Sequence, residues 1–218
     1  MSLTQELADF QNRFRENQAP EILATMQAAT DNLERSGITD RTLKIGDSVP
    51  DFELPDVNGE SVELRSLLQR GSVVLSFYRG GWCPYCNLEL RALQRIQPQI
   101  QAAGATLVAV SPETPDNSLT TTEKNELSYP VLSDVGNRVA REFGLVFTLP
   151  ETLRPLYAEW GIDIPAHNGD DRFDLPVPAT YVIAPSGNVV LAFANADYTQ
   201  RLDTEAILAA LKPLQIPA

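Results

Sequence analysis

The chain has 218 residues and is poor in cysteine, histidine and positive charge. Two cysteines are too few for a secreted, disulfide-stabilised scaffold. The formal charge of −12 makes nucleic acid and anionic membrane surfaces unexpected partners. No apolar run has the length of a membrane-spanning helix, and the first residues lack the basic and apolar regions of a signal peptide. We therefore expect a cytoplasmic protein.

Both cysteines lie in one short stretch, which carries the strongest chemical signal in the sequence. An apolar run over residues 72–78 predicts a buried strand, two glycines follow, and Trp82 leads into Cys-Pro-Tyr-Cys at 83–86. Helical spacing continues over 84–102. The N-terminus of a helix favours a thiolate and can lower a cysteine pKa from about 8.5 to about 3.5–7.5. In a reducing compartment this pair is expected to be catalytic rather than structural.

The other elements follow a pattern typical of an α/β protein. Residues 105–111 predict a second buried strand, which should lie parallel to the first after a right-handed crossover. Residues 179–184 and 189–194, around a Pro-Ser-Gly-Asn turn, predict a β-hairpin, and a helix follows from Asp203. The pattern predicts the thioredoxin fold, a mixed central sheet flanked by helices. Shorter elements are expected at 62–64 (strand), 66–71 (helical turn), 129–132 (strand) and 137–143 (helix).

An N-terminal helical extension precedes this pattern. Apolar residues three or four apart over 2–36 predict two amphipathic helices, and Pro20 fits the first position of the second one. We divide the chain into an extension at 1–44 and a thioredoxin-like domain at 45–218. Packing of the extension onto the domain is the favoured interpretation. A surface for a homodimer is the alternative, because amphipathicity alone does not choose between them.

The segment 148–176 stands apart from the rest of the domain. Its first part predicts a helix that runs to Trp160, and residues 162–171 predict a polar loop rich in turns. Long connections within compact domains are often functional. His167 is the single histidine of the chain, and we interpret it as a surface residue without a partner rather than a proton shuttle.

Three further motifs carry a family resemblance. They are Gly-Asp-Ser-Val-Pro-Asp-Phe at 46–52, Tyr-Pro-Val-Leu-Ser-Asp at 129–134 and Pro-Ala-Thr-Tyr-Val-Ile at 178–183. From about residue 45 to about 214, the chain resembles peroxiredoxins of the alkyl hydroperoxide reductase/thiol-specific antioxidant group, in the branch with a thioredoxin-style CxxC. The stretch 80–86 resembles the active site of thioredoxins and glutaredoxins. The resemblance implies a thioredoxin fold and an antioxidant, thiol-dependent peroxidase.

The chain also departs from that family. Its members typically carry Pro-x-x-x-Thr-x-x-Cys, and if Cys86 is laid on their peroxidatic cysteine, Cys83 falls on the threonine and Arg79 on the proline. If Cys83 is aligned with the peroxidatic cysteine instead, the proline and the threonine of the family motif are again both missing. Pro178 stands where the family often has a substrate-binding arginine. By resemblance it corresponds to the cis-proline of thioredoxins, which faces the dithiol and shapes the substrate groove.

We expect Cys83 to be the nucleophile, because it lies at the turn, where an exposed thiolate can form. Cys86, more buried on the first helical turn, would then resolve the intermediate into a Cys83–Cys86 disulfide. The peroxiredoxin register gives the reverse assignment, with Cys86 attacked first.

Several neighbours of the two cysteines are candidate supporting residues. Trp82 and Tyr85 would line the site or pack in the core, and Pro84 would fix the start of the helix. Arg79 could stabilise a thiolate or a peroxide oxygen, or pair with a surface carboxylate. Arg201 could supply a positive charge, although the sequence does not place it.

Three functions are consistent with these residues. The first is a peroxidase that reduces hydrogen peroxide or organic hydroperoxides and is restored by a thioredoxin- or glutathione-type donor. The second is a thioredoxin-like thiol–disulfide oxidoreductase or redox sensor, which would act on a disulfide substrate. The third is a redox-dependent binding protein that uses its N-terminal helices. A zinc site or an iron–sulfur cluster shared between subunits is disfavoured by ligand count, so we expect no metal and no cofactor.

Overall fold

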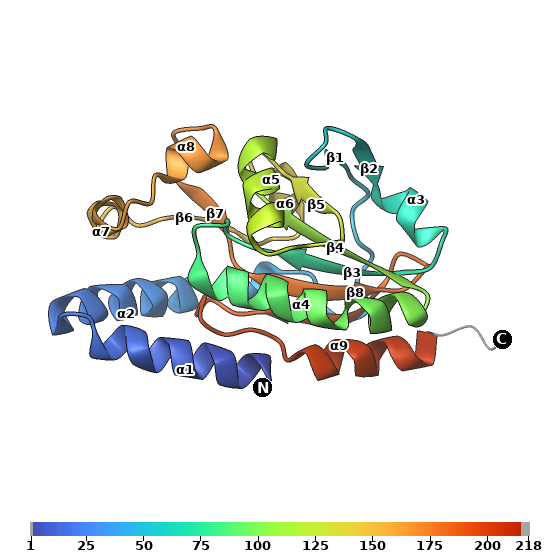
Figure 1. Ribbon diagram of the computed structural model, residues 1–218, viewed down its shortest axis with the longest axis horizontal. Coiled ribbons are helices and arrows are strands. Elements are labelled where there is room, and N and C mark those ends of the chain that lie inside the picture. Colours follow the sequence, from blue (N-terminus) through green and yellow to red (C-terminus); the bar gives the residue numbers. More distant parts are fainter. Residues whose placement is uncertain (1, 215–218) are drawn as a thin grey trace.

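The computed structural model describes residues 2–214 and is built around a five-stranded sheet in the order β5-β4-β3-β8-β9 (Figure 1). β3 pairs in parallel with β4, and β4 with β5, whereas β8 is antiparallel to both β3 and β9. This is the mixed sheet that the sequence predicts. Its strands are β3 (Ser72–Phe77), β4 (Ala105–Ser111), β5 (Val131–Ser133), β8 (Ala179–Ile183) and β9 (Val189–Ala194).

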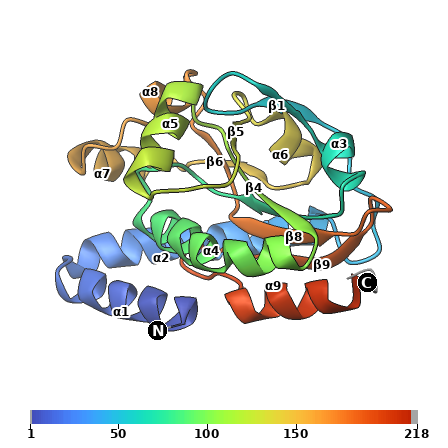
Figure 2. The ribbon, with the colours of Figure 1, turned by 45° about the vertical axis from the view of Figure 1, so that its right-hand side comes forward.

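Helices cover both faces of the sheet (Figures 1 and 2). α4 (Pro84–Ala102) and α9 (Thr204–Leu211) pack on one face, and α3 (Leu64–Leu68) and α6 (Arg138–Glu142) pack on the other. Side chains of β3 alternate between the faces, because successive residues of a strand point to opposite sides. α5 (Pro115–Lys124) packs beside β5.

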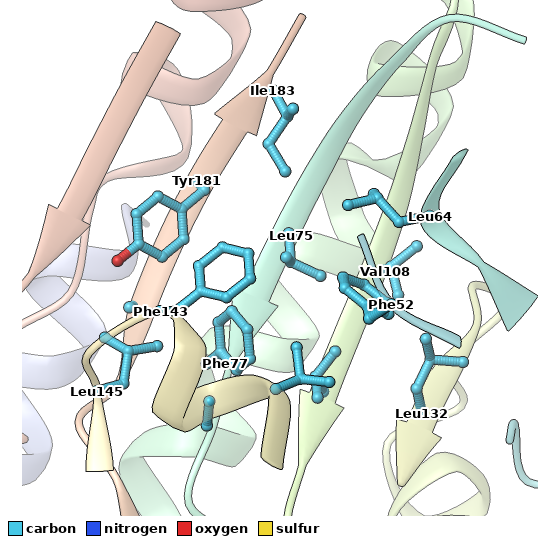
Figure 3. Packing of buried hydrophobic residues seen from close by; sticks show 14 of the residues in the cluster. Phe52, Leu64, Leu75, Phe77, Val108, Leu132, Phe143, Leu145, Tyr181 and Ile183 are labelled. Carbon is cyan, nitrogen blue, oxygen red and sulfur yellow. The ribbon is translucent and has the colours of Figure 1, made fainter. Parts of the chain in front are cut away.

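Three aromatic rings pack against one another within the largely aliphatic core on the α6 side (Figure 3). The rings of Phe77 and Phe143 lie 4.9 Å apart between centroids, and those of Phe143 and Tyr181 lie 5.3 Å apart. All three side chains are fully buried. This packing holds one face of β3, the strand that leads into the dithiol.

The N-terminal helices pack on the domain, as the favoured interpretation predicts (Figures 1 and 2). α1 (Leu3–Glu16) lies along α4, with Leu3 and Leu7 buried in the same cluster as the apolar face of α4. Arg95 also donates to Glu6 at 2.7 Å. The chain continues through α2 (Pro20–Arg35) and η1 (Ile38–Arg41).

The segment 148–176 differs from the prediction. β6 (Val146–Thr148) and β7 (Asp174–Pro176) form a separate antiparallel pair, which was not predicted. The predicted helix that runs to Trp160 is α7 (Arg154–Glu159), with Trp160 as its C-cap residue. The predicted loop contains α8 (Ile164–Asn168), so the prediction of a loop is wrong there. Asp163 caps α8 by accepting from Ala166 N at 3.1 Å, a start signal hidden in a polar sequence.

Three short elements remain in the described part of the chain. β1 (Glu53–Pro55), which the sequence analysis missed, pairs with β2 (Ser61–Glu63), and η2 (Lys212–Leu214) follows α9. Within residues 2–214, no helix is both long and apolar enough to cross a membrane.

Candidate active site

The dithiol lies where β3 passes into α4. Cys83 occupies the N-cap position of α4, Pro84 is its first residue as predicted, and Cys86 lies on the first turn. The turn before it is tightly fitted: Gly81 N donates to Glu113 Oε2 at 2.9 Å. A Cβ atom at Gly81 would lie 1.9 Å from Thr121 Oγ1, so this position excludes any side chain.

Both thiols are free and buried, with Cys83 1% and Cys86 0% exposed. The prediction of an exposed Cys83 is therefore wrong. The reason is the surrounding cover: side chains from α1, α2 and the α7 region, together with Trp82 and Tyr85, line a cavity in front of Cys83. This cavity is partly open to solvent.

Arg79 is a buried cation beside this cavity, 2% exposed. Its guanidinium carbon lies 4.9 Å from the ring centroid of Trp82 and 4.4 Å from that of Tyr198. It also donates to the Tyr157 hydroxyl. Within residues 2–214 it forms no ion pair with a carboxylate, so the surface-pairing alternative is wrong. The nearby Cys83 thiolate is the negative charge that this cation can balance.

A second buried arginine reaches the other sulfur. Arg201 Nη2 donates to Cys86 Sγ at 3.3 Å, and its Nε donates to Glu89 on α4. Thr180 Oγ1 donates to the same carboxylate at 3.3 Å. Burial raises the pKa of Glu89 to about 7, although the charge and hydrogen bond of Arg201 oppose this rise. The positive charge that sequence could not place therefore lies at Cys86.

The two sulfurs have opposite acidities. Burial alone would raise the pKa of Cys83, but the hydrogen bond from the Cys86 thiol and the charges of Arg79 and Arg201 outweigh it and lower the pKa to about 6. The pKa of Cys86 is raised well above its ordinary value by burial and by the neighbouring Cys83. At neutral pH the pair therefore holds one thiolate, on Cys83.

The cavity in front of Cys83, called here the dithiol cavity, has a volume of about 300 Å³. The predicted supporting residues Trp82, Pro84, Tyr85 and Arg79 all line it. The other lining residues are Phe10, Phe14, Gln18 and Met26 from the extension, and Tyr157, Trp160, Ile162 and Tyr198 from the domain.

Pro178 does not line the dithiol cavity. It lies with Arg79 on an adjoining cavity of about 220 Å³. The expected cis bond is also wrong, because no peptide bond among residues 2–214 is cis. Val177 N donates to Leu145 O at 2.8 Å, and the chain passes directly from β7 into β8.

The AhpC/TSA family model matches residues 45–192 of this chain. The chain belongs to the AhpC/TSA family. This match confirms the family resemblance that the motifs indicated. It also confirms the thioredoxin-type fold and the thiol oxidoreductase class of enzyme.

Individual peroxiredoxins and thiol-disulfide oxidoreductases are similar to this chain at moderate identity. The thiol-disulfide oxidoreductase ResA of Halalkalibacterium halodurans is 32% identical over 132 residues, which cover 60% of this chain and 72% of ResA. Peroxiredoxin Bcp of Escherichia coli is 32% identical over 103 residues, covering 47% of this chain and 65% of Bcp. The crystal structure of peroxidoxin BcpB from Mycobacterium tuberculosis superposes with a TM-score of 0.63 at 26% identity, covering 80% of this chain and 99% of BcpB.

Sequence reasoning missed a second polar cluster behind the dithiol turn. His167 Nδ1 lies 2.9 Å from Glu113 Oε1, although 54 residues separate them, and Glu113 is fully buried. The interpretation of His167 as a residue without a partner is therefore wrong. Glu113 holds Gly81 with its other oxygen, so His167 is linked to the active-site turn. No group of three or more potential metal ligands gathers anywhere in residues 2–214.

Proposed function

We propose that this member of the AhpC/TSA family is a thiol-dependent peroxidase in which the Cys83 thiolate attacks the peroxide. The low pKa of Cys83, in a cavity that also holds the Arg79 cation, carries the proposal. A thiolate is the nucleophilic form of cysteine, and the depressed pKa supplies it at neutral pH. Cys86, whose pKa is raised, stays a thiol until it is needed.

The first step transfers one oxygen atom. The Cys83 thiolate attacks an oxygen of ROOH, the O–O bond breaks, and RO⁻ leaves and takes up a proton to become ROH. Cys83 is oxidised to a sulfenic acid, Cys83–S–OH, and the peroxide is reduced. Arg79 lies at the cavity wall, where it can stabilise negative charge on the departing oxygen.

The second step closes the disulfide. Cys86 attacks the sulfur of the sulfenic acid, the S–O bond breaks, and hydroxide leaves and combines with the thiol proton as water. The Arg201 guanidinium, 3.3 Å from Cys86 Sγ, favours the thiolate that makes this attack. The two sulfurs lie close together, because Cys83 is the N-cap residue of α4 and Cys86 lies on its first turn.

A cytoplasmic thiol donor, either one dithiol or two monothiol molecules, then reduces the disulfide in our proposal. A thioredoxin- or glutathione-type donor supplies two electrons and two protons and restores both thiols. We keep the division into an extension at 1–44 and a domain at 45–218, which the start of the family match at residue 45 supports. Homodimer formation stays a prediction, which light scattering of the purified protein would check.

The test is NADPH-coupled consumption of hydroperoxide with thioredoxin and its reductase. Wild type should turn over peroxide, and Cys83→Ser should be inactive. Cys86→Ser should give one oxidation without turnover, and its sulfenic acid should be trapped by dimedone at Cys83. Dimedone labelling at Cys86 in Cys83→Ser, with none at Cys83 in Cys86→Ser, would reverse the assignment of roles.

The second candidate is a thiol–disulfide oxidoreductase. The CxxC quartet and the similarity to ResA favour it. The family match and the similarity to peroxiredoxin Bcp favour the peroxidase over it. Burial of the sulfurs bears on both functions, because a thioredoxin-type donor must reach the same disulfide. Brisk reduction of insulin disulfides, with peroxide consumption at background, would establish this second function in place of the first.

A further inference from the structure

The extension supplies part of the wall of the dithiol cavity. Phe10 and Phe14 come from α1 and Met26 from α2, and all three line the cavity onto which Cys83 opens. The family match begins at residue 45, so these side chains lie outside the part of the chain shared with the family. The reactive sulfur and its cover therefore come from different parts of the chain.

The size of the dithiol cavity exceeds what hydrogen peroxide needs. A water molecule occupies about 30 Å³ in the liquid, whereas this cavity has about 300 Å³. Its walls are mainly aromatic and aliphatic, which is typical of sites for apolar small molecules. A small polar peroxide would leave most of this apolar surface without a partner.

The charged groups of the dithiol cavity gather at the Cys83 end. Cys83 and the buried Arg79 guanidinium both line the cavity. A guanidinium can donate charge-assisted hydrogen bonds to a peroxide oxygen beside the thiolate. A hydroperoxide group on an apolar body therefore matches both ends of the cavity.

We propose that the α1–α2 extension is part of the substrate site and selects organic hydroperoxides with a bulky apolar body over hydrogen peroxide. The proposal rests on the peroxidase function above. The O–O group lies at Cys83 and Arg79, and the carbon body packs against Phe10, Phe14 and Met26. Selectivity for the peroxide therefore resides in residues that precede the family domain.

The kinetic test compares cumene hydroperoxide with hydrogen peroxide. The measured quantity is the ratio of their kcat/KM values in wild type, Phe14→Ala, Met26→Ala and Ile22→Ala. Ile22 lies one turn before Met26 on α2 and lines neither the dithiol cavity nor the adjoining one, so it is a matched control. Removing apolar contacts should lower the ratio about 10-fold in Phe14→Ala and Met26→Ala. In Ile22→Ala the ratio should stay within about twofold of wild type.

Two kinetic outcomes overturn the proposal. One is a ratio that neither cavity variant changes. The other is an equal fall in Ile22→Ala, because the effect would then come from the extension as a whole. Folding of each variant is checked by circular dichroism. Leu3 and Leu7, which stay in place, anchor α1, so the smaller side chain at residue 14 should not release the helix.

A binding test separates this proposal from the peroxidase function. The chain has two tryptophans, Trp82 and Trp160, and both line the dithiol cavity, so their fluorescence reports its occupation. Titration with 2-phenyl-2-propanol, the unreactive alcohol product, should give a saturable change that is about 10-fold weaker in affinity for Phe14→Ala. Peroxide turnover without this change would overturn the cavity assignment alone. Saturable binding without any peroxide turnover would overturn the peroxidase function and keep the apolar site.

Discussion

Arg201 Nη2 lies 3.3 Å from Cys86 Sγ, although 115 residues separate the two in the sequence. The same guanidinium donates to Glu89, one turn further along α4. Arg201 and Glu89 are both almost fully buried. The second sulfur of the dithiol therefore belongs to a buried network of one cation and two acidic groups, which links the loop after β9 to the start of α4.

The first prediction concerns the stability of this network. Arg201→Met leaves the Glu89 carboxyl buried without its cation and should lower the free energy of unfolding at pH 7 by about 3 kcal/mol. Breaking a buried ion pair costs about 3–5 kcal/mol. We expect the lower value, because Glu89, with its pKa of about 7, can take up a proton. The double variant Glu89→Gln with Arg201→Met should recover much of the loss. Urea unfolding measures both, and a double variant no more stable than the single one would contradict the network.

The second prediction concerns the ionisation of Cys83. Alkylation by iodoacetamide, mapped by mass spectrometry, should occur at Cys83 with a midpoint near its pKa of about 6, falling about tenfold per pH unit below it. Arg79→Met should raise the midpoint by about 1–3 units, because it removes a nearby positive charge. Cys83→Ser is the control and should show no labelling in this range. An unchanged midpoint in Arg79→Met would contradict the role of Arg79.

The same ionisation should change stability with pH, which is the third prediction. The pKa of Cys83 falls from its ordinary 9.0 to about 6 on folding. The unfolded chain therefore holds the proton more tightly, and this stabilisation is complete above pH 9 and lost as the pH falls through 6. In the reduced protein the free energy of unfolding should gain a contribution that rises from pH 6 to pH 9. Cys83→Ser should remove that contribution, and an identical slope in this variant would refute it.

The fourth prediction concerns the glycine before the dithiol. Gly81→Ala would place a Cβ atom 1.9 Å from Thr121 Oγ1 and should destabilise the fold by about 1–3 kcal/mol through overpacking. Thr121→Ala removes the clashing oxygen and should restore part of the loss in the double variant. Thermal unfolding of both single variants and the double one gives the coupling. Strictly additive effects would exclude this contact as the cause.

The fifth prediction concerns Glu113 behind the same turn. Glu113→Ala leaves the Gly81 N–H without its acceptor and should cost about 1–3 kcal/mol. His167→Ala should cost a comparable amount, because it leaves the fully buried Glu113 carboxyl without its histidine partner. Only Glu113→Ala removes the acceptor of the Gly81 N–H, so the Cys83 alkylation rate should change more in Glu113→Ala than in His167→Ala. Chemical denaturation and alkylation measure the two effects, and an alkylation change confined to His167→Ala would show that Glu113 does not position the turn.

Sequence patterns predicted the parts of the fold that depend on local signals. The α4 range 84–102 and the β4 range 105–111 agree with the structure, since helical spacing, a proline at the start and a closing glycine all lie within the segment. The hairpin of β8 and β9 follows from its turn residues in the same way. α8 was missed because its cap, Asp163, lies in a polar stretch without apolar periodicity.

The environment of the dithiol could be predicted only in part. The CxxC pair and Pro84 follow from spacing. The burial of Cys83 depends on α1 and α2, and the charge at Cys86 depends on Arg201. These contacts join residues far apart in the chain, and no period or motif of a single sequence encodes them. The pairing of His167 with Glu113 is another contact of this kind.

The attachment of α1 to α4 through Leu3, Leu7 and the Glu6–Arg95 pair has a consequence for how this protein can diversify. The family match begins at residue 45, and residues on both sides of this position line the active site. A fragment that begins there keeps both sulfurs but loses the wall in front of them. Conversely, exchanging the extension leaves the redox chemistry in place and changes what reaches it, so substrate range and reactivity can evolve independently.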